Sequence, residues 1–232
     1  MKKKLSALIV VSALAAPSAF SATYLDSTGE TIGPGILDIS SVEVNNTATA
    51  LSFKINLMGS PVATDWGKYL IGIDSTAGGD LAGNGWGKPI GMSSGMDYFV
   101  GSWVDGGNGA EIRNWTGAWN LQSATYSPNP DALAISKDAS SVTLTFNFAG
   151  LGLAPGSTFA FDVYASGGGG DGAIDAVANP AQTIPGPAWT AYYNSGANVL
   201  SYTIQAVPEP TLGALLELGG LLVVHRYSRR NG

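Results

Sequence analysis

Strict alternation between apolar and polar side chains is the feature of this sequence that most restricts its fold. From Leu51 to Leu57 every second residue is apolar, and serine, lysine and asparagine stand between them. The stretch from Val142 to Phe148 repeats the pattern, with threonine and asparagine as the polar residues. Because successive side chains of a strand point to opposite faces of a sheet, both stretches are predicted to be half-buried β-strands.

Weaker alternation of the same period predicts further strands at Val42–Val44, Tyr69–Ile73, Met96–Val100, Phe159–Val163 and Leu200–Ile204. Glycine accounts for 32 of the 232 residues, about twice its usual share of ~7%, which favours a turn-rich β protein over a helix bundle. We therefore expect an all-β domain, an antiparallel two-sheet β-sandwich of jelly-roll-like type. The glycine-rich segments 78–95, 101–109 and 167–172 are expected to be long loops at the ends of the sandwich.

The first 21 residues have the three parts of a secretory signal peptide. Lysines at positions 2–4 precede an apolar run from Leu5 to Ala16, and small residues follow at Ala19 and Ser21. A buried N-terminal helix would need a polar face, and this run contains only two serines. We therefore expect export of the chain and cleavage after Ser21.

Residues 207–232 combine three further features. They are the motif Val207-Pro208-Glu209-Pro210, an apolar stretch from Thr211 to Val224, and a basic end with Arg226, Arg229 and Arg230. The apolar stretch is shorter than the ~20 residues of a usual membrane-spanning helix, although arginines at its end can reach the interface. An ordinary C-terminal membrane anchor or a hydrophobic surface helix is one interpretation of this tail.

The order of motif, hydrophobic helix and basic terminus resembles the PEP-CTERM sorting signal of Gram-negative bacteria. Tails of that family are recognised by a membrane protease called exosortase. The resemblance implies transient tethering to the inner membrane, cleavage near the Pro-Glu-Pro motif, and transfer to the cell surface or the extracellular space. It divides the chain into a signal peptide (1–21), a β-sandwich domain (22–206) and a sorting signal (207–232).

The region between the two ends is strongly acidic and lacks several catalytic residue types. It keeps five of the 11 basic and 15 of the 17 acidic residues, a net charge of −10. Such a field repels nucleic acids and anionic membranes, so we expect no nucleic-acid partner. The chain has no cysteine, and its one histidine, His225, lies in the tail. Thiolate and histidine chemistry is therefore excluded for this region.

We expect no catalytic residue in the mature domain. Gly91-Met92-Ser93-Ser94-Gly95 matches the Gly-x-Ser-x-Gly pattern of a nucleophile elbow. Because no histidine base accompanies Ser93, we interpret the motif as a flexible turn.

A second resemblance covers about 55 residues from Tyr24 onward. An Asp- and Gly-rich opening, Tyr24–Glu30 and Gly33–Ile39, leads into Val42–Val44, Leu51–Ile55 and Tyr69–Asp74. This order resembles the sandwich modules grouped with the C-terminal domain of glucodextranase and the family 9 carbohydrate-binding modules. The resemblance implies a sandwich that binds sugars.

Six tryptophans supply candidate residues for sugar binding. Several stand beside glycine or asparagine rather than within alternating strands, as in Gly85-Trp86-Gly87. Flat indole rings can cover the apolar faces of pyranose rings while polar side chains bind the hydroxyls. We expect a platform of Trp86, Trp103, Trp115 and Trp119, with Trp66 and Trp189 packed. The alternative for each indole is that it fills an end of the sandwich.

Two glycine-rich turns are candidate calcium sites. Asp74–Asp80 and Gly170–Asp175 each combine two aspartates with several backbone carbonyls, the oxygen ligands that calcium prefers. We name Asp74 and Asp80 as candidate ligands, and solvated loop aspartates are the alternative. No other cofactor is expected.

Three function classes follow. The first is an exported, exosortase-sorted surface or matrix protein that binds polysaccharide and is not an enzyme. The second is a structural or adhesive surface protein without a small ligand. The third is a glycan-active enzyme with two carboxylates about 5 to 9 Å apart across a cleft. Exposed aromatic rings on one face favour the first class, buried tryptophans the second, and facing acids in a deep pocket the third.

Overall fold

Nearly all regular structure in the computed structural model is β-strand; the model describes residues 20–30, 33–181, 188–196 and 198–207. The strands are β1 (Phe20–Leu25), β2 (Ile39–Asn46), β3 (Ala50–Leu57), β4 (Lys68–Asp74), β5 (Ile90–Gly91), β6 (Tyr98–Trp103), β7 (Gly109–Trp115), β8 (Trp119–Ala124), β9 (Ala134–Lys137), β10 (Ser141–Asn147), β11 (Thr158–Ser166), β12 (Asp175–Ala176), β13 (Tyr193–Asn194) and β14 (Leu200–Thr203). The helical elements with described bounds are two single 3-10 turns, η1 (Gly35–Leu37) and η2 (Phe148–Leu151).

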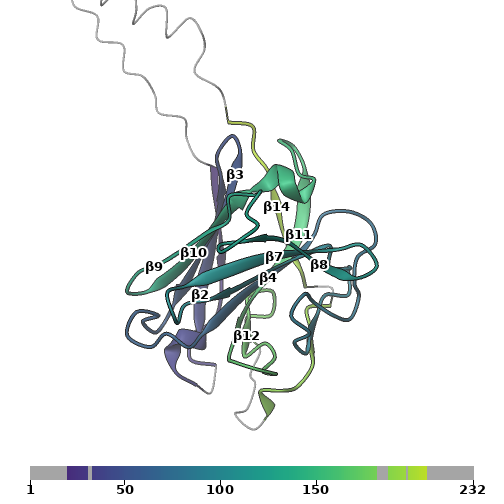
Figure 1. The fold of residues 1–232 in the computed structure, drawn as a ribbon. Coiled ribbons are helices and arrows are strands. Elements are labelled where there is room, and N and C mark those ends of the chain that lie inside the picture. Colours follow the sequence, from purple (N-terminus) through teal and green to yellow (C-terminus); the bar gives the residue numbers. More distant parts are fainter. Residues whose placement is uncertain (1–19, 31–32, 182–187, 197, 208–232) are drawn as a thin grey trace, which may run out of the picture. The chain divides into compact units, whose positions relative to one another are not determined.

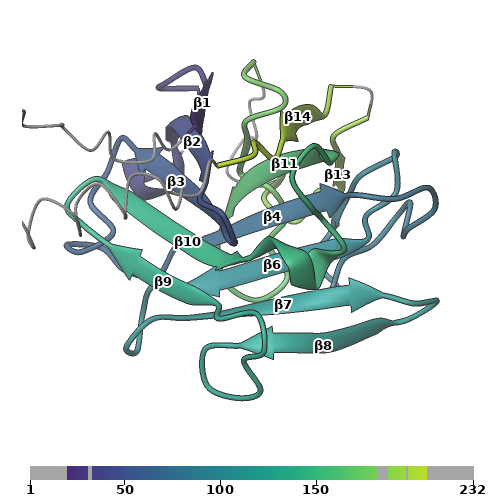
Figure 2. The same cartoon turned by 90° about the horizontal axis from the view of Figure 1, so that it is seen from above.

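Most strands belong to two antiparallel sheets, which can be followed in Figure 1. The five-stranded sheet has the order β1-β2-β3-β10-β9, and the seven-stranded sheet has the order β12-β11-β4-β6-β7-β8 with β14 added to β11. Figure 2 shows β4, β6, β7 and β8 side by side. β5 and β13 form a separate, short parallel pair. The predicted all-β, antiparallel two-sheet sandwich is confirmed.

The main core lies between the two sheets and is built by the alternating residues of the sequence pattern. Phe53 on β3 is fully buried, and its ring contacts Phe146 on β10 and Phe161 on β11. The polar residues between them stay at intermediate exposure on the other face of the five-stranded sheet. Burial of this apolar set is the main force that holds the sheets together.

The seven-stranded sheet is covered on its outer face as well. Phe99 on β6 and Tyr164 on β11 pack there against Met92 and Met96, in a second core cluster. The expectation that segment 78–95 is a loop at an end of the sandwich is therefore wrong, because this segment lies across a sheet face. Its apolar side chains are separated by glycines without a regular period, so the sequence showed the turns but not the packing.

The expectation of one loop over segment 101–109 is also wrong. Residues 101–103 belong to β6 and Gly109 begins β7, so the two strands form a hairpin with a short turn. The third glycine-rich segment, 167–172, follows β11 and contains no strand.

Both predicted targeting segments fall mainly outside the described residues. β1 begins at Phe20, two residues before the expected mature N-terminus Ala22, and pairs with β2. Among the described residues, no helix has the length and apolar character needed to cross a membrane.

Candidate functional site

The four tryptophans predicted to form a platform gather on the outer face of the seven-stranded sheet. By strand alternation, Trp103 shares this face of β6 with Phe99, and Trp115 lies on the same face of β7. Trp119 begins β8 and is paired directly with Trp115 across the hairpin. Trp86 comes from the segment that covers this face, so residues from four separate elements meet here.

The indoles form a continuous row of neighbouring rings with Phe99 and Tyr126, here called the aromatic row. Along the row, the ring centroids are separated by 5.6 Å (Trp115–Trp119), 6.4 Å (Trp119–Phe99), 5.7 Å (Phe99–Trp86), 6.2 Å (Trp86–Trp103) and 6.4 Å (Trp103–Tyr126). Neighbouring rings are inclined to each other by 38° to 72°. The row is therefore a stepped aromatic surface and not a flat platform.

Two glycines make room for indoles on the sheet. A Cβ atom added to Gly101 on β6 would lie 2.5 Å from ring carbons of Trp86, and one added to Gly109 on β7 would overlap the ring of Trp103. Each indole thus lies directly over the backbone of a strand. Any side chain at these two positions would displace a ring of the aromatic row.

The carboxylates of Glu111, which is buried, and Asp80, which has intermediate exposure, fix the orientation of two indoles. Trp86 Nε1 donates a hydrogen bond to Glu111 Oε2 at 3.0 Å, and Trp119 Nε1 donates to Asp80 Oδ2 at 2.8 Å. Asp80 Oδ1 also accepts the backbone N–H groups of residues 82 and 83. Asp80, predicted as a calcium ligand, therefore serves in this structure to hold a turn and an indole.

Glu111 is the polar centre of the aromatic row. Besides Trp86, it accepts hydrogen bonds from the Tyr126 hydroxyl and from Arg113 Nε, the latter at 2.9 Å. Burial by itself raises the pKa of Glu111, but the hydrogen bonds from Tyr126, Trp86 and Arg113 outweigh burial and the pKa is lowered. The carboxylate is therefore ionised at neutral pH and its charge is balanced by Arg113.

The aromatic row is only partly covered. Phe99 is fully buried, Tyr126 is 59% exposed, and the four tryptophans have intermediate exposure. These tryptophans are thus neither fully exposed nor fully buried.

The two tryptophans expected to pack lie outside the aromatic row. The ring centroids of Trp66 and Trp189 are 6.3 Å apart, and the two ring planes are inclined to each other by 30°. Trp189 packs against the main core, whereas Trp66 keeps 37% of its surface exposed.

A pocket of about 260 Å³ adjoins the aromatic row at Trp86. Its other lining residues are Lys68, Lys88 and the glycines 167–169. Among the residues that the structure describes, those lining this pocket include no carboxylate.

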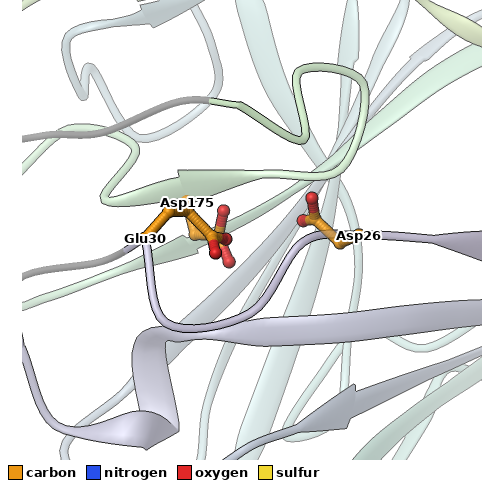
Figure 3. Close-up of side chains that lie close together, drawn as sticks. All are labelled: Asp26, Glu30 and Asp175. Carbon is orange, nitrogen blue, oxygen red and sulfur yellow. The ribbon is translucent and has the colours of Figure 1, made fainter.

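Three carboxylates converge at another place in the fold. Oxygen atoms of Asp26 and Glu30, from the segment after β1, and of Asp175, on β12, lie within 4.8 Å of one another. Figure 3 shows these side chains meeting from two segments far apart in the sequence. This cluster could hold a metal ion, while Asp74 belongs to no such group among the described residues.

Several oxygens at this cluster have no hydrogen-bond partner among the described residues. They are Asp26 Oδ2, both carboxylate oxygens of Glu30, and Oδ1 of the neighbouring Asp38, whose side chain is only 6% exposed. Burial and the surrounding negative charges raise the pKa of Asp26 to about 7 and that of Asp175 to about 8. A bound cation would satisfy these oxygens and offset their mutual repulsion.

Two further sequence predictions concern Ser93 and the sorting signal. Ser93 is exposed, and its backbone N–H donates to Asn194 Oδ1. Of the predicted sorting residues, Pro208, Glu209, Pro210, Arg226, Arg229 and Arg230 lie outside the described residues, and Val207 is the last described residue.

Sequence reasoning missed Tyr126, Glu111 and Lys88. Nothing in their local sequence marks them, because their partners are brought together only by strand pairing and by the covering segment. No family model matches the chain, and no curated protein and no solved structure is significantly similar to it.

Proposed function

We propose that this protein is an exported surface or matrix protein whose β-sandwich binds polysaccharide through the aromatic row without catalysing a reaction. The observation that carries the proposal is the meeting of four half-buried indoles from separate elements on one sheet face. Tyr126 extends the same surface and is largely exposed.

The chemistry of the aromatic row suits a sugar chain. Exposed ring faces can cover the apolar C–H faces of pyranose rings, while Glu111 and Arg113 offer a charged acceptor and donor for hydroxyl groups. Two indoles are already anchored through Nε1, so they lose little conformational freedom when a ligand binds. A purely structural role would leave the exposure of Tyr126 and the pocket beside Trp86 without a purpose.

We also propose calcium as the metal of the Asp26, Glu30 and Asp175 cluster. The donors are all carboxylate oxygens, which fits a hard cation with several oxygen ligands. The ion would hold the segment after β1 against β12 and take no part in a reaction. The earlier prediction of calcium at Asp74 and Asp80 stays a prediction.

The sorting of the chain is a separate proposal that rests on the PEP-CTERM resemblance. An exosortase-type protease would release the domain from a transient inner-membrane anchor in a Gram-negative cell. Intact-mass analysis of the native protein should show loss of Arg229 and Arg230. Native material that still carries both arginines would contradict this proposal.

Polysaccharide binding is tested with the full chain and a panel of soluble glucans, galactans, mannans and xylans in affinity electrophoresis. The variant Tyr126→Ala removes an exposed ring of the aromatic row, and Tyr192→Ala removes an equally exposed ring elsewhere, since the two side chains are 59% and 54% exposed. We expect Tyr126→Ala to weaken binding severalfold and Tyr192→Ala to leave it unchanged. Equal effects of both variants, or no retardation by any polymer, would contradict the proposal.

A further inference from the structure

The pocket beside Trp86 collects positive charge in a domain that has very little of it. Residues 22–206 contain five basic side chains against 15 acidic ones, and two of the five, Lys68 and Lys88, line this one pocket. The other lining residues are Trp86 and the three glycines 167–169, which carry no charge. Two lysines at one pocket of an acidic domain suggest that the pocket has a role of its own.

Lys88 is a buried ammonium group held by neutral oxygens. Its side chain is 7% exposed, and Nζ donates to Ser166 Oγ and to the carbonyls of Gly167, Gly169 and Asp171 at 3.0 to 3.2 Å. No carboxylate oxygen is among these hydrogen-bond partners in the described part of the chain. The carbonyls orient the ammonium group but do not cancel its charge.

Lys68 has a partner that a ligand can replace. Its Nζ donates to both carboxylate oxygens of Asp105 at 3.2 Å and to the carbonyl of Trp66 at 3.1 Å. The Asp105 side chain is 47% exposed, so this ion pair is weak and exchanges readily in water. Burial lowers the pKa of Lys88, the Asp171 carboxylate opposes this shift, and the charge of Lys68 adds to it. The two ammonium groups are therefore close enough to interact, with the Asp171 carboxylate also nearby.

The size and walls of the pocket indicate what kind of anion would enter. A volume of about 260 Å³ lies just below the range of pockets for drug-sized ligands, so it has room for about one sugar ring. The indole of Trp86 forms one wall and belongs to the aromatic row, so a sugar in the pocket would continue a chain bound along that row. Glycines 167–169 contribute backbone but no side chain to the lining.

We propose that this pocket binds the carboxylate of a uronic acid residue within a polysaccharide, with Lys68 and Lys88 facing the carboxylate and Trp86 facing the sugar ring. This inference rests on the polysaccharide binding proposed above and adds the charge of the ligand. The net charge of −10 repels a densely charged polymer, whereas one carboxylate in the pocket meets two ammonium groups. The preferred ligand is therefore a chain with sparse uronate residues.

Methyl esterification tests the proposal, because it removes the charge of a uronate and leaves its ring unchanged. Full-length protein is titrated by calorimetry with galacturonan and with glucuronan, each in unesterified, partly esterified and fully esterified form. We expect the partly esterified form of at least one polymer to bind about tenfold more tightly than its fully esterified form. We expect the unesterified form to bind more weakly than the partly esterified one.

The variant Lys68→Gln should abolish the preference for the charged polymer and keep binding of the fully esterified form. Lys54→Gln is the matched control, since the Lys54 side chain is 40% exposed, forms an ion pair with Glu43 on the five-stranded sheet, and lies outside the pocket. Equal binding of charged and esterified forms would overturn the uronate inference and leave the proposed function standing. A preference for the charged polymer that Lys68→Gln does not change would also overturn the uronate inference. If the protein binds neither galacturonan nor glucuronan in any form, the inference fails together with the proposed binding of these two polymers.

Discussion

The two faces of the seven-stranded sheet carry different kinds of side chain on the same strands. On the inner face, β11 presents Phe159, Phe161 and Val163, all buried in the main core. On the outer face, the same strand presents Asp162, Tyr164 and Ser166, and β7 presents Glu111. The inner face is mainly apolar, whereas the outer face combines half-exposed rings with hydrogen-bonded polar groups.

This difference separates stability from binding. Buried apolar area without polar atoms is the least costly way to hold two sheets together. Buried charged groups such as Lys88 and Glu111 each need hydrogen-bond partners, and both have them here. We infer that the inner face supplies most of the stability and the outer face supplies the recognition.

The largest effect is expected for Phe161→Ala on the inner face. Phe161 is fully buried and contacts the rings of Tyr24, Phe53 and Phe159. Its truncation leaves a cavity and should lower the free energy of unfolding by about 3 to 5 kcal/mol. Chemical denaturation measures the change. Polysaccharide affinity of the remaining folded protein should not change, and a specific binding defect would break the separation of the two faces.

Removal of calcium should have the next largest effect. If the acidic cluster binds calcium, free ion at 100 times its dissociation constant should raise the free energy of unfolding by about 2.7 kcal/mol. Thermal melts in calcium and in chelator measure this difference. Glu30→Gln should abolish it, whereas Glu43→Gln, a change of the same kind on β2 outside the cluster, should preserve it. Identical melts of the wild type in calcium and chelator would contradict calcium binding.

Asp162 should make stability depend on pH in a direction unusual for a carboxylate. Burial raises its pKa from 3.8 to about 7, although Ser195, Ala178 and Val163 donate hydrogen bonds to it. The folded state therefore holds the proton more tightly than the unfolded state, and this contribution to stability is lost as pH rises from about 4 to 7.

Asp162→Asn isolates this contribution. The amide can still accept the two backbone hydrogen bonds and donate to Ser195, but it does not ionise. Between pH 5 and pH 7 the wild type should lose roughly 2 kcal/mol more stability than the variant does. Asp26 and Asp175 add to the pH dependence of both proteins, so the slopes are compared and not the absolute values. Equal slopes would mean that Asp162 is ionised in the folded protein.

The sequence predicted the inner face well because period-two alternation is a local property. Leu51–Leu57 and Val142–Phe148 fall on β3 and β10, and the weaker alternations fall on or overlap β2, β4, β6, β11 and β14. β7 and β8 were not predicted, because their alternation is short: on β7, Ala110 and Ile112 alternate with Glu111 and Arg113 over only four residues. Alternation over so few residues is a weak signal for a strand.

The candidate site was predicted only in part. Neighbouring glycine or asparagine pointed to several tryptophans of the aromatic row. Trp103, Trp115 and Trp119 nevertheless lie in strands and not in loops. Their order, their tilt and the part played by Tyr126 depend on strand pairing. The local spacing of the turn Gly170–Asp175 pointed to Asp175, but tertiary contacts join it to Asp26 and Glu30, so the cluster itself could not be predicted.

The smallest expected change, Trp103→Ala, tests the central claim most directly. Trp103 belongs to the aromatic row, lies over Gly109 and has intermediate exposure. If its ring stacks on sugar, its removal should weaken binding of the best polysaccharide about fivefold, or about 1 kcal/mol. The free energy of unfolding should fall by clearly less than for Phe161→Ala. A loss of about 3 to 5 kcal/mol in stability with unchanged affinity would show that Trp103 is a structural plug and would contradict the account.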